Sequence, residues 1–152
     1  MVDDWDADFY YLAEDESLMV RAIEHLLAAG FERLYRFVGN DGLVWQYSFL
    51  KDDAKFEFFR TVKSDATVLQ YYDFVPSSAP VQQKKSFAGL PWSNLEFLDA
   101  SWLAPKEIDR SLTSMYGDWR TPDPHWCWAD DPLTISRETW EHSDTLHWTE
   151  GN

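Results

Sequence analysis

The chain begins with an alternation of acidic and hydrophobic residues that predicts a β-strand over residues 4–12. In the stretch DWDADF, residues 4–9, an aspartate occupies every second position. Alternate residues of a strand share one face, so Asp6 and Asp8 are expected on the same side. Like charges this close repel each other unless water or a cation lies between them. The pattern is therefore typical either of a frayed acidic terminus or of a strand that presents carboxylates to a cation.

Helical spacing follows this strand. Apolar residues recur three and four positions apart and predict a helix over residues 17–29, which Gly30 ends. Residues 31–75 then alternate in short runs separated by GNDG and KDDA, two typical turn sequences. This part predicts a meander of three or four antiparallel strands.

The second half of the chain has weaker patterns. Residues 76–91, PSSAPVQQKKSFAGLP, predict a flexible loop, in which Lys84 and Lys85 either lie in solvent or cover an anionic ligand. One or two short strands are expected within residues 94–105, then a helix over 105–117, then an irregular, Trp-rich tail. Together the patterns predict one α/β (α+β) domain over residues 1–152: a small, mostly antiparallel sheet with two main helices.

Composition narrows the classes of partner. The formal net charge of −14 argues against nucleic acid or an anionic membrane as the main partner, although it allows a nucleotide bound through a metal ion. The sequence has a single cysteine, no signal peptide and no apolar run long enough to span a membrane. These features predict a cytoplasmic protein.

A third acidic residue, Glu57, stands between Phe56 and Phe58 on a predicted internal strand. Burying a carboxylate is costly unless it is paired or bound to a cation. One interpretation is a salt bridge to Lys55 or Arg60, or a position facing solvent. The other is that Asp6, Asp8 and Glu57 converge from neighbouring antiparallel strands on a divalent cation, which is chemistry for phosphoryl or nucleotidyl transfer.

Four stretches, DADFYYLAED, LLAAGF, KFEFF and YGDWRTPDPHW, resemble in order and spacing the LicD/fukutin family. The resemblance covers residues 4 to about 132, and YGDWRTP is its most specific part. It implies a nucleotidyltransferase fold and transfer of a phosphate-containing group from a CDP-linked donor to a glycan hydroxyl, dependent on Mg²⁺ or Mn²⁺. Asp6 and Asp8 resemble the family's metal motif and would hold the metal. Glu57 stands where the family usually has aspartate, and would either complete the metal site or accept the proton of the acceptor hydroxyl. Arg120, within YGDWRTP, is then either a phosphate contact, alongside Lys84 and Lys85, or an ion-pair partner of Asp118 or Asp123.

Members of that family also have an upstream helix and glycine-rich turn that grip the donor phosphates. Only three residues precede Asp4 here, so a partner chain or a second copy is expected to supply this element. Two alternatives to the transferase remain open. One is a catalytically incomplete binding or regulatory module that works through protein contacts. The other is an acidic protein that occupies a basic surface of its partner.

Overall fold

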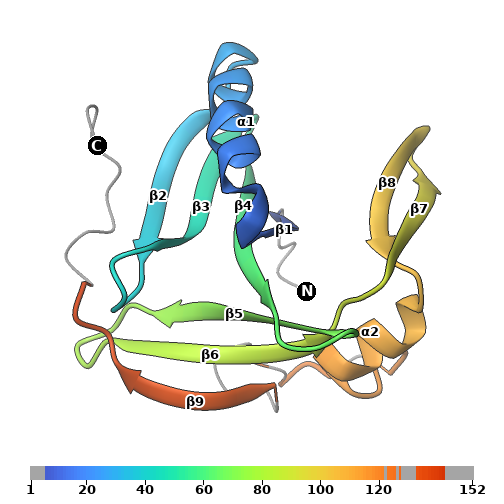
Figure 1. Ribbon diagram of the computed structural model, residues 1–152. Coiled ribbons are helices and arrows are strands. Elements are labelled where there is room, and N and C mark those ends of the chain that lie inside the picture. The colour runs from blue at the N-terminus through green and yellow to red at the C-terminus, as the bar shows by residue number, and fades with distance from the viewer. Residues whose placement is uncertain (1–5, 122, 126, 128–132, 143–152) are drawn as a thin grey trace.

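The computed structural model describes residues 6–121, 123–125, 127 and 133–142, in which strands predominate (Figure 1). Strands make up 51% and helices 19% of the structure. The expectation of an α/β, nucleotidyltransferase-like fold is therefore wrong, and the fold is mostly antiparallel β. The elements are β1 (Asp6–Leu12), a 3-10 turn (Ala13–Asp15), α1 (Glu16–Ala28), β2 (Glu32–Val38), β3 (Val44–Lys51), β4 (Ala54–Lys63), β5 (Val68–Val75), β6 (Val81–Ala88), β7 (Trp92–Phe97), β8 (Ala100–Pro105), α2 (Ile108–Tyr116) and β9 (Thr134–Thr139).

Strand β4 belongs to two groups of strands. Its first part pairs with β3 on one edge and with β1 on the other, which makes the N-terminal half-sheet, β1 to β4. Its last residues, Val62 and Lys63, pair with β5, which continues into β6 and β9, the C-terminal half-sheet. Figure 1 shows the C-terminal half-sheet crossing the lower end of the N-terminal half-sheet. The two half-sheets therefore face each other around the bend in β4.

The first strand joins the sheet in parallel with β4, and not antiparallel as expected. The 3-10 turn and α1 carry the chain away from the end of β1, and a parallel neighbour needs such a crossover. The register places Asp6 opposite Lys55 and Asp8 opposite Glu57. The alternation therefore does put both aspartates on one face, and that face carries Glu57 as well.

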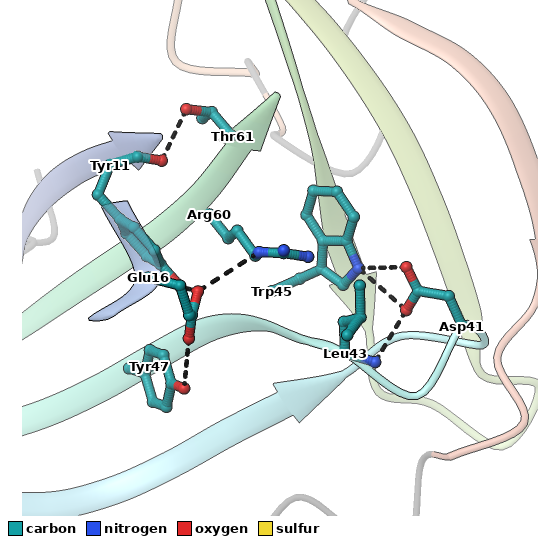
Figure 2. Close-up of polar contacts among 8 residues, drawn as sticks. All are labelled: Tyr11, Glu16, Asp41, Leu43, Trp45, Tyr47, Arg60 and Thr61. Atoms are coloured by element: carbon teal, nitrogen blue, oxygen red, sulfur yellow. Dashed lines mark hydrogen bonds and ion pairs between the residues drawn. The ribbon is translucent and has the colours of Figure 1, made fainter. Parts of the chain in front are cut away.

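Helix α1 covers the opposite face of the N-terminal half-sheet. Its buried residues Met19 and Ile23 pack in one cluster with Tyr47 and Phe49 of β3. At its first residue, Glu16 accepts hydrogen bonds from the hydroxyls of Tyr11 (3.0 Å) and Tyr47 (3.2 Å). An ion pair to Arg60 at 3.4 Å adds to them (Figure 2). Apolar packing along the helix and polar contacts at its start fix it to the sheet.

Two hydrophobic clusters fill the space between the half-sheets. One combines residues of β1, β4, β5 and β6: Leu12, Phe59, Leu69, Tyr71 and Phe87. The other, the Trp140 cluster, combines Phe37, Trp45, Phe74 and Trp140. The indole N–H of Trp140 donates to the carbonyl of Val38 at 2.7 Å and so ties the end of β9 to β2. At the same end of the sheet, Asp41 accepts from the Leu43 amide and the Trp45 indole in the β2–β3 turn (Figure 2).

Two segments expected to be irregular are strands. The predicted loop 76–91 contains β6, and the predicted irregular tail contains β9, which pairs with it. In β6 the inward positions include Gln83 and Lys85, both at most 2% exposed, besides Phe87. Polar residues at buried positions hid the two-residue period on which the prediction depended.

The remaining predictions of secondary structure are confirmed. The GNDG and KDDA turns close hairpins, with Gly42 at φ +77° and both aspartates of KDDA at positive φ. Helices occur at α1 and α2, and Gly117 follows α2 at φ +66°. Strands β7 and β8 form a separate hairpin. In the part of the chain that the structure describes, neither helix has the length and apolar character needed to cross a membrane.

Candidate functional site

A hollow of about 370 Å³ opens between the two half-sheets. Its charged lining comes from four strands, β1, β4, β5 and β6. These side chains are Asp6, Asp8, Lys55, Glu57, Asp73 and Lys85. Four carboxylates against two ammonium groups leave an excess of two negative charges among these side chains. Aromatic residues, including Tyr10, Tyr35 and Tyr71, form much of the remaining wall.

Asp6, Asp8 and Glu57, the carboxylate cluster, come together in this hollow. One carboxylate oxygen from each lies within 4.8 Å of the others, a spacing that could hold a metal ion. Register explains the convergence, because Tyr35, Ser48, Glu57 and Asp8 are successive partners across β2, β3, β4 and β1. The sequence prediction that these three acids cluster agrees with this geometry.

Neighbouring strands hold Glu57 in place. Its side chain is 8% exposed. Its Oε1 accepts hydrogen bonds from the Tyr35 hydroxyl (2.8 Å), the Gln46 amide (2.7 Å) and the Ser48 hydroxyl (3.0 Å). Three donors on one oxygen fix the rotamer of this side chain. Only Oε2 of Glu57 is directed to other partners.

That second oxygen contacts Lys55. The ammonium Nζ lies 3.0 Å from Glu57 Oε2 and 3.2 Å from Asp6 Oδ2. Burial alone would lower the pKa of Lys55, but its contacts with Glu57 and Asp6 raise it. The salt bridge considered for Glu57 from sequence is therefore present together with the clustering of the three acids.

Asp8 has no cationic contact of this kind within the cluster. It is open to solvent at the rim, but it faces into the hollow beside the other two acids. Partial burial, and then the charges of Glu57 and Asp6, raise the pKa of Asp8 from 3.8 to about 7. The cluster therefore resists carrying three charges at neutral pH, which a bound cation would relieve.

A buried ion pair forms another wall of the hollow. Lys85 is 1% exposed and its Nζ lies 2.9 Å from Asp73 Oδ2 on the adjacent strand β5. Burial raises the pKa of Asp73, although Lys85 partly offsets this. Sequence reasoning placed Lys85 on a loop, and the structure places it on a strand inside the hollow.

The other two predicted substrate-binding residues are elsewhere. Arg120 forms an exposed ion pair with Asp109 at 2.6 Å, and not with Asp118 or Asp123. Lys84 is half-buried and, as the neighbour of Lys85 in a strand, faces away from the hollow. Neither residue is among those that line the hollow.

Four residues of the site were not expected from the sequence: Tyr35, Gln46, Ser48 and Asp73. Gln46 is 4% exposed, and its Oε1 has no hydrogen-bond partner among the described residues. The orientation of the Gln46 side-chain amide follows from its contact with Glu57, because the carboxylate can only accept and so requires the NH₂ group to point toward it. The polar residues inside the apolar run VWQYSFL were the available signal, because buried polar groups need partners.

Comparison of the chain with protein-family models, curated proteins and solved structures found no match.

Proposed function

We propose that the hollow is the divalent-cation centre of a transferase that moves a phosphate-containing group from a CDP-linked donor to a glycan hydroxyl. The observation that carries the proposal is the carboxylate cluster, three acidic side chains brought together by register across neighbouring strands. Donor and acceptor come from the resemblance to the LicD/fukutin family and remain part of the proposal.

The chemistry of the donor set fits Mg²⁺ or Mn²⁺. Both ions prefer oxygen ligands, and Mg²⁺ in particular is often held by few carboxylates together with substrate phosphates. The formal excess of two negative charges in the hollow matches one divalent ion. Burial raises the pKa of Asp8 most, and the charges of Glu57 and Asp6 add to the rise; a bound cation would offset that repulsion. The buried Gln46 oxygen without a partner is a further polar atom beside the cluster.

We assign roles to the three acids from their contacts. Oε1 of Glu57 already accepts three hydrogen bonds, so Oε2 is the oxygen through which Glu57 would hold a cation. Asp6 and Asp8 complete the ligand set from the adjacent strand. A bound ion would supply charge neutralisation for the phosphate groups and orient them for attack by the acceptor oxygen. The Lys85 ammonium, paired with Asp73, is a second cationic group in the lining of the same hollow.

The test is release of CMP from CDP-choline and CDP-ribitol in the presence of Mg²⁺. We expect Asp6→Ala to abolish release and Glu14→Ala, which removes an exposed carboxylate next to the same strand, to leave it unchanged. Nucleotide binding is measured in parallel by calorimetry, with and without Mg²⁺. Absence of metal-dependent binding of any nucleotide would overturn the proposal.

A second candidate function is a module that works through protein contacts. The β7–β8 hairpin favours it, because three of its apolar residues stand well exposed: Phe97 (59%), Leu98 (78%) and Leu103 (70%). Exposed apolar residues grouped on one hairpin are typical of an interaction surface. Substitution of Phe97 and Leu103 by serine should then abolish partner binding without changing nucleotide binding.

A further inference from the structure

Lys55 occupies the position where a cation would bind the carboxylate cluster. Its Nζ contacts Asp6 Oδ2 and Glu57 Oε2, which are oxygens of two of the three acids. The opposite oxygen of Glu57 already accepts three hydrogen bonds. A metal ion can therefore reach Glu57 only through the oxygen that Lys55 holds.

We propose that Lys55 is a positioning residue that exchanges partners: it holds Asp6 and Glu57 together while no metal is bound, and on metal binding it moves to the phosphate oxygens of the donor. This inference rests on the proposed function.

Charge favours this exchange. A divalent cation and an ammonium group that share one carboxylate oxygen repel each other, which favours departure of the ammonium. Lys55 has room to leave, because its side chain is 31% exposed and its flexible stem ends at the rim of the hollow. Once the metal ion holds the three carboxylates, we expect the displaced ammonium to pair with a phosphate group of the substrate.

The exchange predicts opposite effects on two ligands. Lys55→Met removes the competitor, so Mn²⁺ alone should bind about tenfold tighter, the change expected for the loss of one nearby charge. The same variant should bind CDP about tenfold more weakly at saturating Mn²⁺, because the phosphate loses a cationic partner. A residue that only supports the fold would not move the two affinities in opposite directions.

Calorimetry with Mn²⁺, and with CDP at saturating Mn²⁺, provides the test. Lys63→Met is the matched control, because Lys63 lies on the same strand but pairs with Glu14 at an exposed position away from the hollow. It should change neither affinity. Lys55→Arg keeps the charge and should bind Mn²⁺ within about threefold of the unmodified protein. Far-UV circular dichroism confirms that each variant is folded.

The outcomes separate this inference from the proposed function. If the unmodified protein binds Mn²⁺ and Lys55→Met binds it equally or more weakly, the exchange is wrong and the metal centre stands. If Lys55→Met does not fold, the test uses Lys55→Arg. An Mn²⁺ affinity close to that of the unmodified protein, together with retained CDP binding, supports the exchange. A large loss of Mn²⁺ affinity or of CDP affinity overturns it. If the folded unmodified protein and Lys55→Met both bind no Mn²⁺, the proposed function and the exchange fail together.

Discussion

Glu57 illustrates how single residues make this site. Its position between two phenylalanines indicates a carboxylate that needs a partner, and the structure supplies four contacts, three of them to Oε1. The sequence could predict Asp6, Asp8 and Glu57, because strand alternation and burial are local properties. It could not predict Tyr35 or Ser48 as partners, since these reach Glu57 only through the registers of β2, β3 and β4.

Asp8 gives the site a pH dependence. Folding raises its pKa from 3.8 to about 7, so between these values the folded chain binds more protons than the unfolded chain. Stability conferred by the protonated carboxyl is therefore lost as the pH rises from about 4 to about 7. We expect the melting temperature of the metal-free protein to fall between pH 5 and pH 8.

Asp8→Asn should flatten this fall and melt at a higher temperature at pH 8. Some slope should remain, because the pKa of Asp73 is raised in the same direction. Asp109→Asn, at an exposed position outside the hollow, is the control and should keep the original slope. An unchanged slope in Asp8→Asn would show that Asp8 does not titrate as described.

At the scale of elements, turns were easier to predict than strands. Glycine and aspartate at GNDG and KDDA mark the hairpins directly, because these residues tolerate positive φ. Strands β6 and β9 escaped prediction, because the buried face of β6 carries glutamine and lysine and because β9 is recognisable only by its pairing with β6.

The β7–β8 turn has residues that are unusual at positive φ. Leu98 and Asp99 occupy its two central positions at φ +53° and +58°. A branched apolar residue at positive φ is strained, and Leu98 is also 78% exposed. We expect the double substitution Leu98→Asn with Asp99→Gly to stabilise the hairpin by about 0.5–1 kcal/mol.

Hydrogen exchange of the β7 and β8 amides measures this effect, because a two-stranded hairpin opens locally. Exchange should slow in the hairpin and stay unchanged in β3 and β4. Faster exchange in the hairpin would mean that Leu98 makes a stabilising contact in solution.

At the scale of the whole molecule, the bend in β4 creates the hollow. Composition and periodicity do not predict it, because one strand changes partners along its length, from β1 and β3 to β5. The Trp140 cluster holds the two half-sheets around this bend, since it joins residues of β2, β3 and β5 to the end of β9.

Trp140→Ala should therefore loosen both half-sheets at once. Trp140 is 1% exposed, and we expect a loss of about 3–5 kcal/mol in the free energy of unfolding, measured in urea. Trp140→Phe keeps a ring but leaves the Val38 carbonyl without its donor, which costs about 1–3 kcal/mol. Ile135→Ala, at an exposed position of β9, should change stability by no more than about 0.5 kcal/mol. Equal losses for Trp140→Ala and Ile135→Ala would contradict this role of the cluster.

The central claim, that the hollow holds a divalent cation, is tested most directly by a crystal structure of the protein grown with Mn²⁺. The anomalous difference map should show one peak bound by Asp6, Asp8 and Glu57 Oε2, with the Lys55 ammonium withdrawn from both carboxylates. A map with no peak in the hollow, and with Lys55 still bridging Asp6 and Glu57, would contradict the account.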